Sequence, residues 1–193
     1  MDAFDLYIVN LKKNNDFVDV YRDGIAGGPL FGHVLWVNEV FLAIKCFDDN
    51  GIYDGFSIIR KSDISRLRVG GNELKSIKNL ILAKHNPSLI HIPENDVFLL
   101  EKSKNFEEVF NGLKKYNFFT IYIEQIDQDI SFIGEIKQSD QKIIILNAYG
   151  TKKGLDHSEL LLRLEDITRV DIDTTYMNDI YYVNPLKPKR SGN

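Results

Sequence analysis

Cysteine, tryptophan and proline are scarce in this chain: 193 residues include one Cys, one Trp and five Pro. A single cysteine, Cys46, excludes an internal disulfide and is typical of a reducing cytosol. Because Cys46 falls in an apolar run, we interpret it as a small core residue. Long apolar stretches are missing too, so no membrane-spanning helix is expected. Residues 1–5 have neither a basic start nor a long apolar segment, so we expect no secretory signal and a cytoplasmic protein without a membrane partner.

The chain also lacks an excess of positive charge, since its formal net charge is −4. Residues 1–70 carry eight Lys/Arg against ten Asp/Glu, and residues 106–173 carry eight against thirteen. A nucleic-acid interface usually needs a basic stripe, so this composition favours other partners. The basic residues near the C-terminus belong to a short Pro-containing tail from about residue 185, which we expect to be disordered.

Patterns for catalysis, metal binding or a cofactor are missing as well. The four histidines show no metal-ligand spacing, and no Ser-His-Asp or Cys-His order indicates a nucleophile. Residues 48–54 resemble part of a calcium loop but lack its closing glutamate, and a hairpin turn explains them better. Residues 24–29 are Gly-rich without P-loop spacing. We therefore expect a protein that is not an enzyme and has no metal and no cofactor.

What the sequence does contain is an internal similarity. Residues 4 to about 70 reappear 102 to 103 positions later, from 106 to about 172. Each copy opens with apolar residues at i, i+3, i+4 and i+7, which indicates one face of a helix. The closest match between the copies is Asp63–Leu67 with Asp166–Val170. Each matched position can therefore be interpreted twice, once in each copy.

Five short strand patterns follow the helix in each copy. We expect them at 17–21, around 31–34, at 40–47, around 58–60 and from 63, and then at 118–124, around 133–136, at 142–149, around 161–163 and from 166. Five strands this short leave two exposed edges in a flat sheet, so bending into a partly closed barrel is favoured. We predict a mainly β chain with short helices, built from two tandem five-stranded bent barrels that each follow an N-terminal helix.

Residues 71–105 are expected to have no counterpart elsewhere in the chain. Asn72 is a plausible N-cap for a helix, and residues 96–101 are interpreted as a short strand. The segment is too apolar for a flexible linker, so we expect an ordered insert. The predicted domains are a first barrel at 1–70, the insert at 71–105, a second barrel at 106–175 and a C-terminal segment at 176–193.

The pattern resembles the Sm-like family. Gly134, Asp140 and the run Ile143–Leu146 resemble the family's first motif, and the first unit has Gly32 and Asn38 at the corresponding positions. The resemblance covers about 70 residues in each unit and implies a strongly bent, SH3-like five-stranded barrel. Sm-like proteins assemble into rings of six or seven and bind single-stranded RNA in the central pore.

The residues through which the family contacts RNA are not matched here. Leu42 and Ile144 stand where the eukaryotic and archaeal branch has a base-contacting asparagine. Lys61-Ser62 and Leu164-Glu165 replace the family's second motif, an Arg-Gly or Lys-His pair, and an acidic residue there is unfavourable for RNA. The resemblance supports the fold more than it supports RNA binding.

Sm-like rings grow by pairing the edge strands of neighbouring barrels. A covalent pair of barrels could do so internally, and three chains would then form a pseudo-hexamer. In the alternative, the 71–105 insert covers an edge and stops growth. The sequence leaves both open.

Charged residues shared by the two copies are the candidates for a duplicated RNA or ligand site between the fourth and fifth strands. A local role is favoured, in which the aspartate caps the turn while the arginines pair with it or face solvent. The candidate residues are Arg60, Lys61, Asp63 and Arg66 in the first unit and Arg163, Asp166 and Arg169 in the second.

The function we expect is a non-catalytic cytoplasmic binding or assembly module that acts through protein–protein contacts, including self-association. The alternative is an RNA-binding Sm-like protein, in the form of a trimer with a pseudo-hexameric ring. A third hypothesis is a small-molecule-binding regulatory domain that uses the Gly-rich loop at 24–29.

Overall fold

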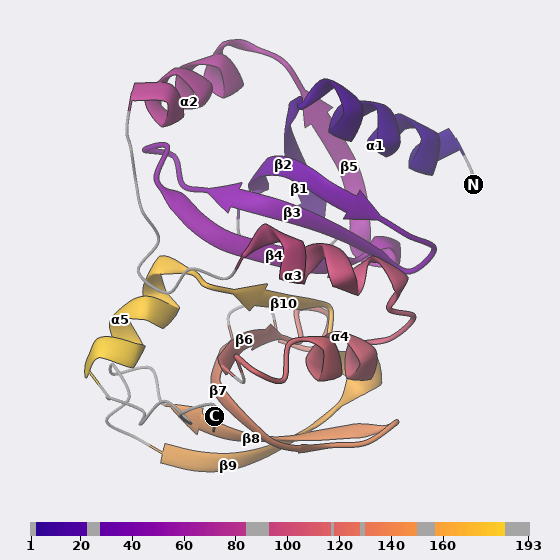
Figure 1. The fold of residues 1–193 in the computed structure, drawn as a ribbon, viewed down its shortest axis with the longest axis vertical. Coiled ribbons are helices and arrows are strands. Elements are labelled where there is room, and N and C mark those ends of the chain that lie inside the picture. The colour runs from indigo at the N-terminus through magenta and orange to yellow at the C-terminus, as the bar shows by residue number, and fades with distance from the viewer. Residues whose placement is uncertain are drawn as a thin grey trace.

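Ten antiparallel strands form one continuous sheet in the order β5-β1-β2-β3-β4-β10-β6-β7-β8-β9. The computed structural model describes residues 3–22, 28–83, 93–116, 118–127, 130–149 and 157–183. Short helices accompany the sheet, and the first five strands lie above the last five in Figure 1. The prediction of a mainly β chain with short helices is confirmed. The two-barrel arrangement stays a prediction, because the strands form a single open sheet.

The predicted strands of the repeated region occur close to their expected places. The first half consists of α1 (Ala3–Asn14), β1 (Phe17–Arg22), β2 (Leu30–Val37), β3 (Phe41–Phe47), β4 (Tyr53–Arg60), the 3-10 helix η1 (Lys61–Asp63) and β5 (Ile64–Val69). The second half consists of α4 (Phe106–Gly112), β6 (Phe118–Tyr122), β7 (Ser131–Ser139), β8 (Ile143–Tyr149), β9 (His157–Arg163), the 3-10 helix η3 (Leu164–Asp166) and β10 (Arg169–Ile172). In each half the fifth strand pairs with the first, so the orders β5-β1-β2-β3-β4 and β10-β6-β7-β8-β9 are the same.

The glycine of the second strand is required by a close approach of the next strand. A Cβ atom on Gly32 would lie 1.9 Å from the carbonyl oxygen of Lys45, and one on Gly134 would lie 2.1 Å from that of Asn147. A β-bulge follows in both places, where β2 pairs with β3 and β7 with β8. Bulges bend and twist a sheet, so both halves curve at equivalent positions.

The turn after each of these strands is held by the same side-chain chemistry. The side-chain oxygen of Asn38 accepts hydrogen bonds from the backbone N–H groups of Val40 and Phe41 at 2.8 and 2.7 Å. Asp140 accepts from the two equivalent N–H groups at 2.7 and 2.9 Å. These two bonds hold the pKa of the Asp140 carboxyl below its ordinary value. The residue six positions after each glycine therefore has a local structural role in both halves.

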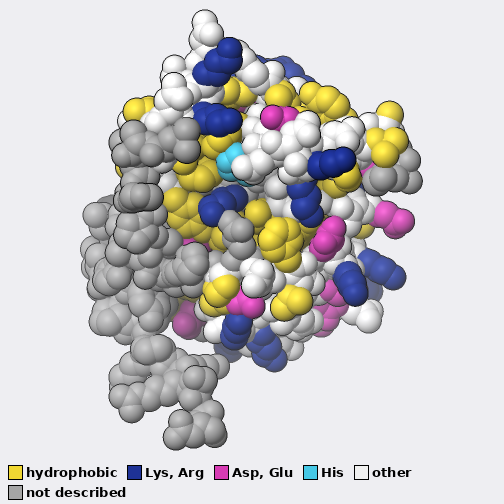
Figure 2. Space-filling view, turned by 45° about the horizontal axis from the view of Figure 1, so that its top comes forward, with side chains coloured by type: hydrophobic (Ala, Val, Ile, Leu, Met, Phe, Trp, Pro, Cys, Tyr) yellow, Lys and Arg dark blue, Asp and Glu magenta, His cyan; other side chains and the backbone are white. Residues whose placement is uncertain are grey.

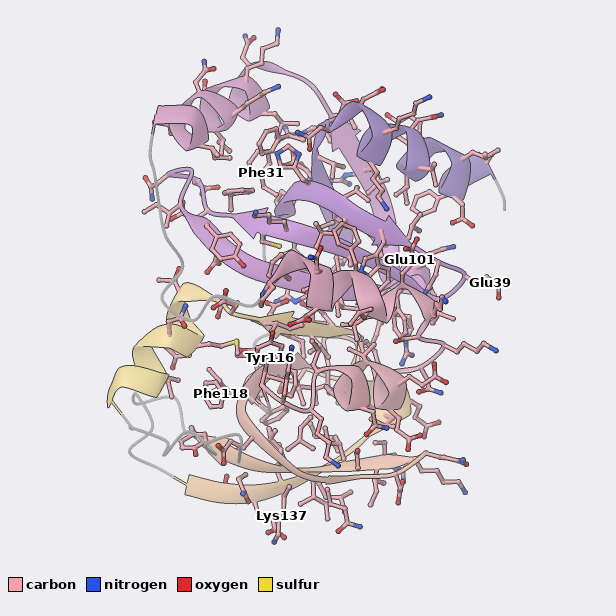
Figure 3. The ribbon with its side chains drawn as sticks, viewed as in Figure 1. Phe31, Glu39, Glu101, Tyr116, Phe118 and Lys137 are labelled. Carbon is pink, nitrogen blue, oxygen red and sulfur yellow. The ribbon has the colours of Figure 1, made fainter. Side chains whose placement is uncertain are left out.

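The correspondence between the halves extends further than the sequence suggests. Helix α2 (Asn72–Ala83) follows β5, and α5 (Thr175–Val183) follows β10 at a distance of 103 positions. Leu74 and Ile77 of α2 join one apolar cluster with β1 and β2, while Met177 and Ile180 of α5 join another with β6, β7 and β8. Figure 3 labels a strand residue of each cluster, Phe31 below α2 and Phe118 near α5. The prediction that residues 71–105 have no counterpart is therefore wrong for α2.

The strand predicted at 96–101 is also wrong. This segment forms α3 (Glu94–Phe98) and the 3-10 helix η2 (Leu99–Lys102). Val97 and Leu100 are both buried, and their spacing of three residues suits a helix that packs one face. A four-residue apolar run does not distinguish strand from helix by periodicity, so packing against the rest of the protein decides the outcome.

The apolar core crosses the boundary between the halves. Its largest cluster joins residues of β2, β3 and β4 to residues of α3, α4 and the second set of strands, including Trp36, Phe41, Phe106 and Ile121. Strand β3 is buried on both faces, as its apolar run predicted. Strand β8 is only partly covered, so the outer face of the second half is more open than that of the first.

None of the described helices is long and apolar enough to cross a membrane. The tail from about residue 185 and most of the Gly-rich segment at 24–29 lie outside the described residues.

Candidate functional site

The seven candidate residues lie around η1, η3 and the strands beside them, where several have partners of their own. Lys61 lies 2.5 Å from the carboxylate of Asp5 and donates to the carbonyl of Asn38 at 2.9 Å. Arg163 is exposed and lies 3.6 Å from Glu165. An exposed pair of this kind contributes little, on the order of 0–1 kcal/mol. The structure therefore does not bring the candidates together as one cluster.

Two of the candidates, Arg66 and Arg169, stack on tyrosines of the strand beside them. The guanidinium carbon of Arg66 lies 4.0 Å from the ring centre of Tyr21, and that of Arg169 lies 3.6 Å from the ring centre of Tyr122. Arg66 is exposed because β5 is an outer strand, whereas Arg169 is buried because β10 lies between β4 and β6. Equivalent residues thus form a surface contact in one half and an interior contact in the other.

Arg169 belongs to a buried ionic network that joins the halves. The carboxylate of Glu124 lies 3.4 Å from Arg169 and 3.3 Å from Arg22, at the end of β1. Asp171 lies 3.3 Å from Arg169 and accepts a 2.5 Å hydrogen bond from Ser57 on β4. Two cations face two anions, so removal of one member leaves a buried charge without compensation.

The pKa values of the two arginines reflect this burial. Burial, followed by the neighbouring charge of Arg169, lowers the pKa of Arg22. Burial also opposes the charge of Arg169, but Asp171, Tyr122 and Glu124 outweigh it and raise the Arg169 pKa. The network therefore holds Arg169 firmly in its charged form.

Cys46 lies beside this network on β3, with its sulfur 3.3 Å from the hydroxyl of Ser57. Burial, together with the charge of Asp171, raises the pKa of the Cys46 thiol to about 12. A buried thiol that stays protonated is a poor nucleophile. The interpretation of Cys46 as a core residue is confirmed.

On the first half, the turn between β2 and β3 is covered by the insert. The side-chain amide of Asn38 donates to the carbonyl of Glu101 at 2.8 Å. The indole N–H of Trp36 donates to the carbonyl of Val97, also at 2.8 Å. Figure 3 labels Glu39 and Glu101 at this corner of the molecule. Residues 93–105 therefore act as a cover for the outer face of the first half.

Phe106 of α4 completes that cover. Its ring centre lies 4.8 Å from that of Phe41 and 5.7 Å from the guanidinium carbon of Arg60. Arg60 also donates to the carbonyls of Leu164 and Glu165 at 3.2 and 2.9 Å. The candidate residue Arg60 thus lies at the junction between the halves, where β4 pairs with β10, and it hydrogen-bonds the first half to η3 of the second.

The equivalent place on the second half is a surface cavity of about 470 Å³. The residues that line it are Gln141, Lys142, Ile143, Arg163 and Glu165. They correspond one by one to Glu39, Val40, Phe41, Arg60 and Ser62 of the first half. Where Phe106 packs in the first half, the second half therefore has an open, partly basic hollow.

A smaller cavity of about 260 Å³ lies between α4 and β7 on the same half, beside Lys114 and Lys137. Its first-half equivalent is the region where Trp36 contacts the insert. Both openings therefore occur where the first half is covered by a later part of the chain.

The sheet ends at β5 on one side and β9 on the other, and no described strand pairs with the outer edge of either. The described part of the insert packs on the face of the sheet and on α4, and it pairs with neither outer strand. Residues 84–92 of the insert lie outside the described residues. The two edges are thus the places where the described sheet can be extended.

No family model, curated protein or solved structure matches this chain. Within the described residues, no group of three or more His, Cys, Asp or Glu side chains is arranged to hold a metal ion. The face turned to the viewer in Figure 2 shows lysine and arginine side chains scattered among acidic ones, without a single basic stripe. The outer strands and the cavity beside β9 are therefore the candidate binding surfaces of the described residues.

The sequence pointed to some of these residues and missed others. The internal sequence similarity identified Arg60, Arg163 and Arg169, which lie at the β4–β10 junction or at the cavity. It missed Arg22, Glu124 and Asp171, because their equivalents in the other half are different residue types and nothing local marks them as buried.

Proposed function

We propose that the protein is a non-catalytic assembly module that acts through protein–protein contacts made by the outer strands of its sheet. The main observation in support of this proposal is the pairing of β4 with β10. In that pairing the fourth strand of the first half meets the fifth strand of the second, with Ile58 opposite Val170 and Ser57 opposite Asp171. One edge-to-edge contact is thus already built into the chain, and the same two edge types, β9 and β5, remain at its ends.

Two Sm-like units joined edge to edge account for this arrangement, and they are part of the proposal. Support comes from the identical strand order of the halves, the close glycine approaches and the repeated turns at Asn38 and Asp140.

The side chains of the outer strands also favour association. Leu161 on β9 is 57% exposed, and Val69 on β5 is exposed as well. An outer strand with unpaired backbone groups is a template for another strand unless charge, proline or a covering segment blocks it. Leu161 and Val69 favour pairing with another strand, while the exposed Arg66 and Arg68 on β5 and Glu159 and Arg163 on β9 restrict which strand can pair there.

The test is the molar mass of the full chain by size-exclusion light scattering over a range of concentrations, with an RNA-binding titration at two salt concentrations. We expect a mass above the 22.2 kDa of one chain, and no RNA affinity that falls with salt. A chain that stays monomeric at its highest soluble concentration would contradict the proposal.

The second candidate function is RNA binding by an Sm-like protein. The observation in its favour is the cavity beside β9, where Lys142 and Arg163 supply two cations. Glu165 in the same cavity opposes it. Phosphate contacts release counterions, so RNA binding through these residues would weaken steeply with salt, and Arg163→Gln would reduce both the affinity and the salt dependence. That result in the titration would favour the RNA-binding function instead.

A further inference from the structure

We propose that the partner at the β9 edge is a second copy of this chain, whose β5 pairs with β9 and whose Phe4 enters the cavity beside Ile143 and Arg163. The inference rests on the proposed function and names its partner. Its template is the junction that the chain already forms between its own halves.

The junction predicts the register of the new strand pair. In the chain, Ile59 lies opposite Arg169, Ile58 opposite Val170 and Ser57 opposite Asp171. Moving each residue to its equivalent in the other half gives the intermolecular pairs. Leu162 would lie opposite Arg66, Leu161 opposite Leu67, and Leu160 opposite Arg68, where the arginines and Leu67 belong to the second copy.

This register covers the apolar side chains that the edges leave exposed. Leu161 is the most exposed residue of the set, and in the new pair it lies against Leu67. Its equivalent, Ile58, is fully buried by the same kind of pairing.

The cavity predicts where α1 of the second copy lies. In the junction, Phe106 of α4 packs between Phe41 and Arg60. The equivalents of Phe41 and Arg60 are Ile143 and Arg163, both in the lining of the cavity. The equivalent of Phe106 is Phe4 of α1. Phe4 is partly buried against the apolar cluster of its own half, and in the proposed docking its remaining exposed surface fills the cavity of the neighbouring copy.

The next turn of α1 supports the same docking. Tyr7 is 49% exposed, whereas its equivalent on α4, Val109, is completely buried. Two further apolar residues of α1, Leu6 and Val9, are also exposed. The equivalents of Leu6 and Val9 on α4 are Glu108 and Asn111, which are exposed. Tyr7 is therefore the exposed residue of α1 whose equivalent on α4 is covered.

Each chain has one β9 edge and one β5 edge, so the contact is head to tail. Such a contact joins different surfaces of the two copies and builds either a closed ring or an open filament. Two variants with opposite faces disabled can therefore complement each other, which a symmetric dimer interface would not allow.

The register is tested with paired cysteines in a Cys46→Ala background. Leu160→Cys with Arg68→Cys matches the internal pair of Ser57 and Asp171, whose side-chain oxygens lie 2.5 Å apart. Eight strands separate β9 from β5 within one chain, so this disulfide can form only between copies. We expect disulfide-linked dimers and larger species on a non-reducing gel.

The matched control is Leu160→Cys with Arg66→Cys, which keeps both cysteines on the same strands but shifts the register by two residues. It should form far less of the linked species. If the wild-type chain is oligomeric while the two pairs link equally, or neither links, the proposed docking is wrong and the assembly function stands.

The two surfaces of the proposed contact are tested separately. Tyr7→Lys changes the surface formed by α1 and β5, and Leu161→Lys changes the surface formed by β9. Each variant should weaken association by about tenfold or more, because a lysine replaces an apolar contact at the centre of the interface. Leu99→Lys is the control, since Leu99 is 75% exposed and lies outside the proposed contact. Thermal unfolding followed by circular dichroism should show that all three variants remain folded.

Mixing the two interface variants gives the sharpest outcome. A Tyr7→Lys chain keeps an intact β9 face, and a Leu161→Lys chain keeps an intact α1 and β5 face. At a concentration where each variant alone is monomeric, the mixture should form a one-to-one dimer and nothing larger. Wild-type masses for both single variants, or a mixture that stays monomeric, would overturn the inference, whereas a monomeric wild-type chain would overturn the proposed function itself.

Discussion

The guanidinium of Arg22 lies 3.3 Å from the carboxylate of Glu124, and the two side chains, which come from different halves of the chain, are only 4% and 3% exposed. Glu124 also faces Arg169. This single carboxylate therefore compensates two buried cations across the boundary.

Glu124→Gln should destabilise the protein by about 3–5 kcal/mol, because it keeps the shape of the side chain but leaves two buried arginines opposite Asp171 alone. Urea unfolding at neutral pH measures the effect. The control is Glu165→Gln, in the exposed pair with Arg163, which should cost less than about 1 kcal/mol. Similar losses for the two variants would show that the buried network contributes no more to stability than an exposed ion pair.

Gly32→Ala and Gly134→Ala should both be strongly destabilising. The new methyl group would lie about 2 Å from a backbone carbonyl oxygen of the neighbouring strand, and the strands would have to separate to admit it. Gly28→Ala is the matched control, since a Cβ atom there meets nothing within 4 Å. Melting temperatures distinguish the cases, and an unchanged Gly32→Ala protein would contradict the close packing of β2 against β3.

Ile59→Asp and Leu162→Asp should each cost several kcal/mol, because both side chains are buried and a carboxylate without a partner would be placed in the interior. Leu161→Asp, one residue along β9, is the control, because its side chain lies on the opposite, exposed face of the strand. It should leave the free energy of unfolding of the isolated chain nearly unchanged. A Leu162→Asp chain as stable as Leu161→Asp would mean that the strand faces the other way.

The thiol of Cys46 should react with a thiol reagent only after unfolding, even at pH 9. Its pKa in the folded chain is about 12, against 9.0 for an ordinary cysteine. Since the folded-state pKa is the higher one, its contribution to stability is complete below about pH 9 and declines as the pH rises toward 12. Cys46→Ala should remove this part of the alkaline loss of stability. Rapid labelling of the native protein at pH 8 would show that the site is accessible.

Local patterns were sufficient to predict most elements of the repeated region. Apolar spacing identified α1 and α4, and short apolar runs separated by turn residues identified the strands. The counterpart of α2 was missed because Leu74 and Ile77 are matched by Met177 and Ile180 in a segment of different composition. The segment at 96–101 was misassigned because a short apolar run fits a strand or a helix, and only the burial of Val97 and Leu100 favours the helix.

For the candidate residues too, the sequence predicted part of the result and the tertiary structure supplied the rest. The internal sequence similarity identified Arg60 and Arg169, since a charged residue that recurs at the matching position is visible in the sequence. Their roles were not visible, because a junction contact and a buried ion pair depend on which strands lie side by side. Arg22 and Glu124 are ordinary charged residues until β4 pairs with β10 and encloses them.

By itself, the sequence determined the strands, the turns and the two glycines, since these depend on neighbours within about ten residues or on the partner strand of one hairpin. The tertiary structure decided that the halves join through β4 and β10, that Phe106 fills the groove beside Arg60, and that β9 and β5 remain open. The reason is that edge pairing uses backbone N–H and C=O groups, which nearly every residue carries. Which two edge strands pair therefore depends on how the side chains pack in the folded protein and not on a local sequence pattern.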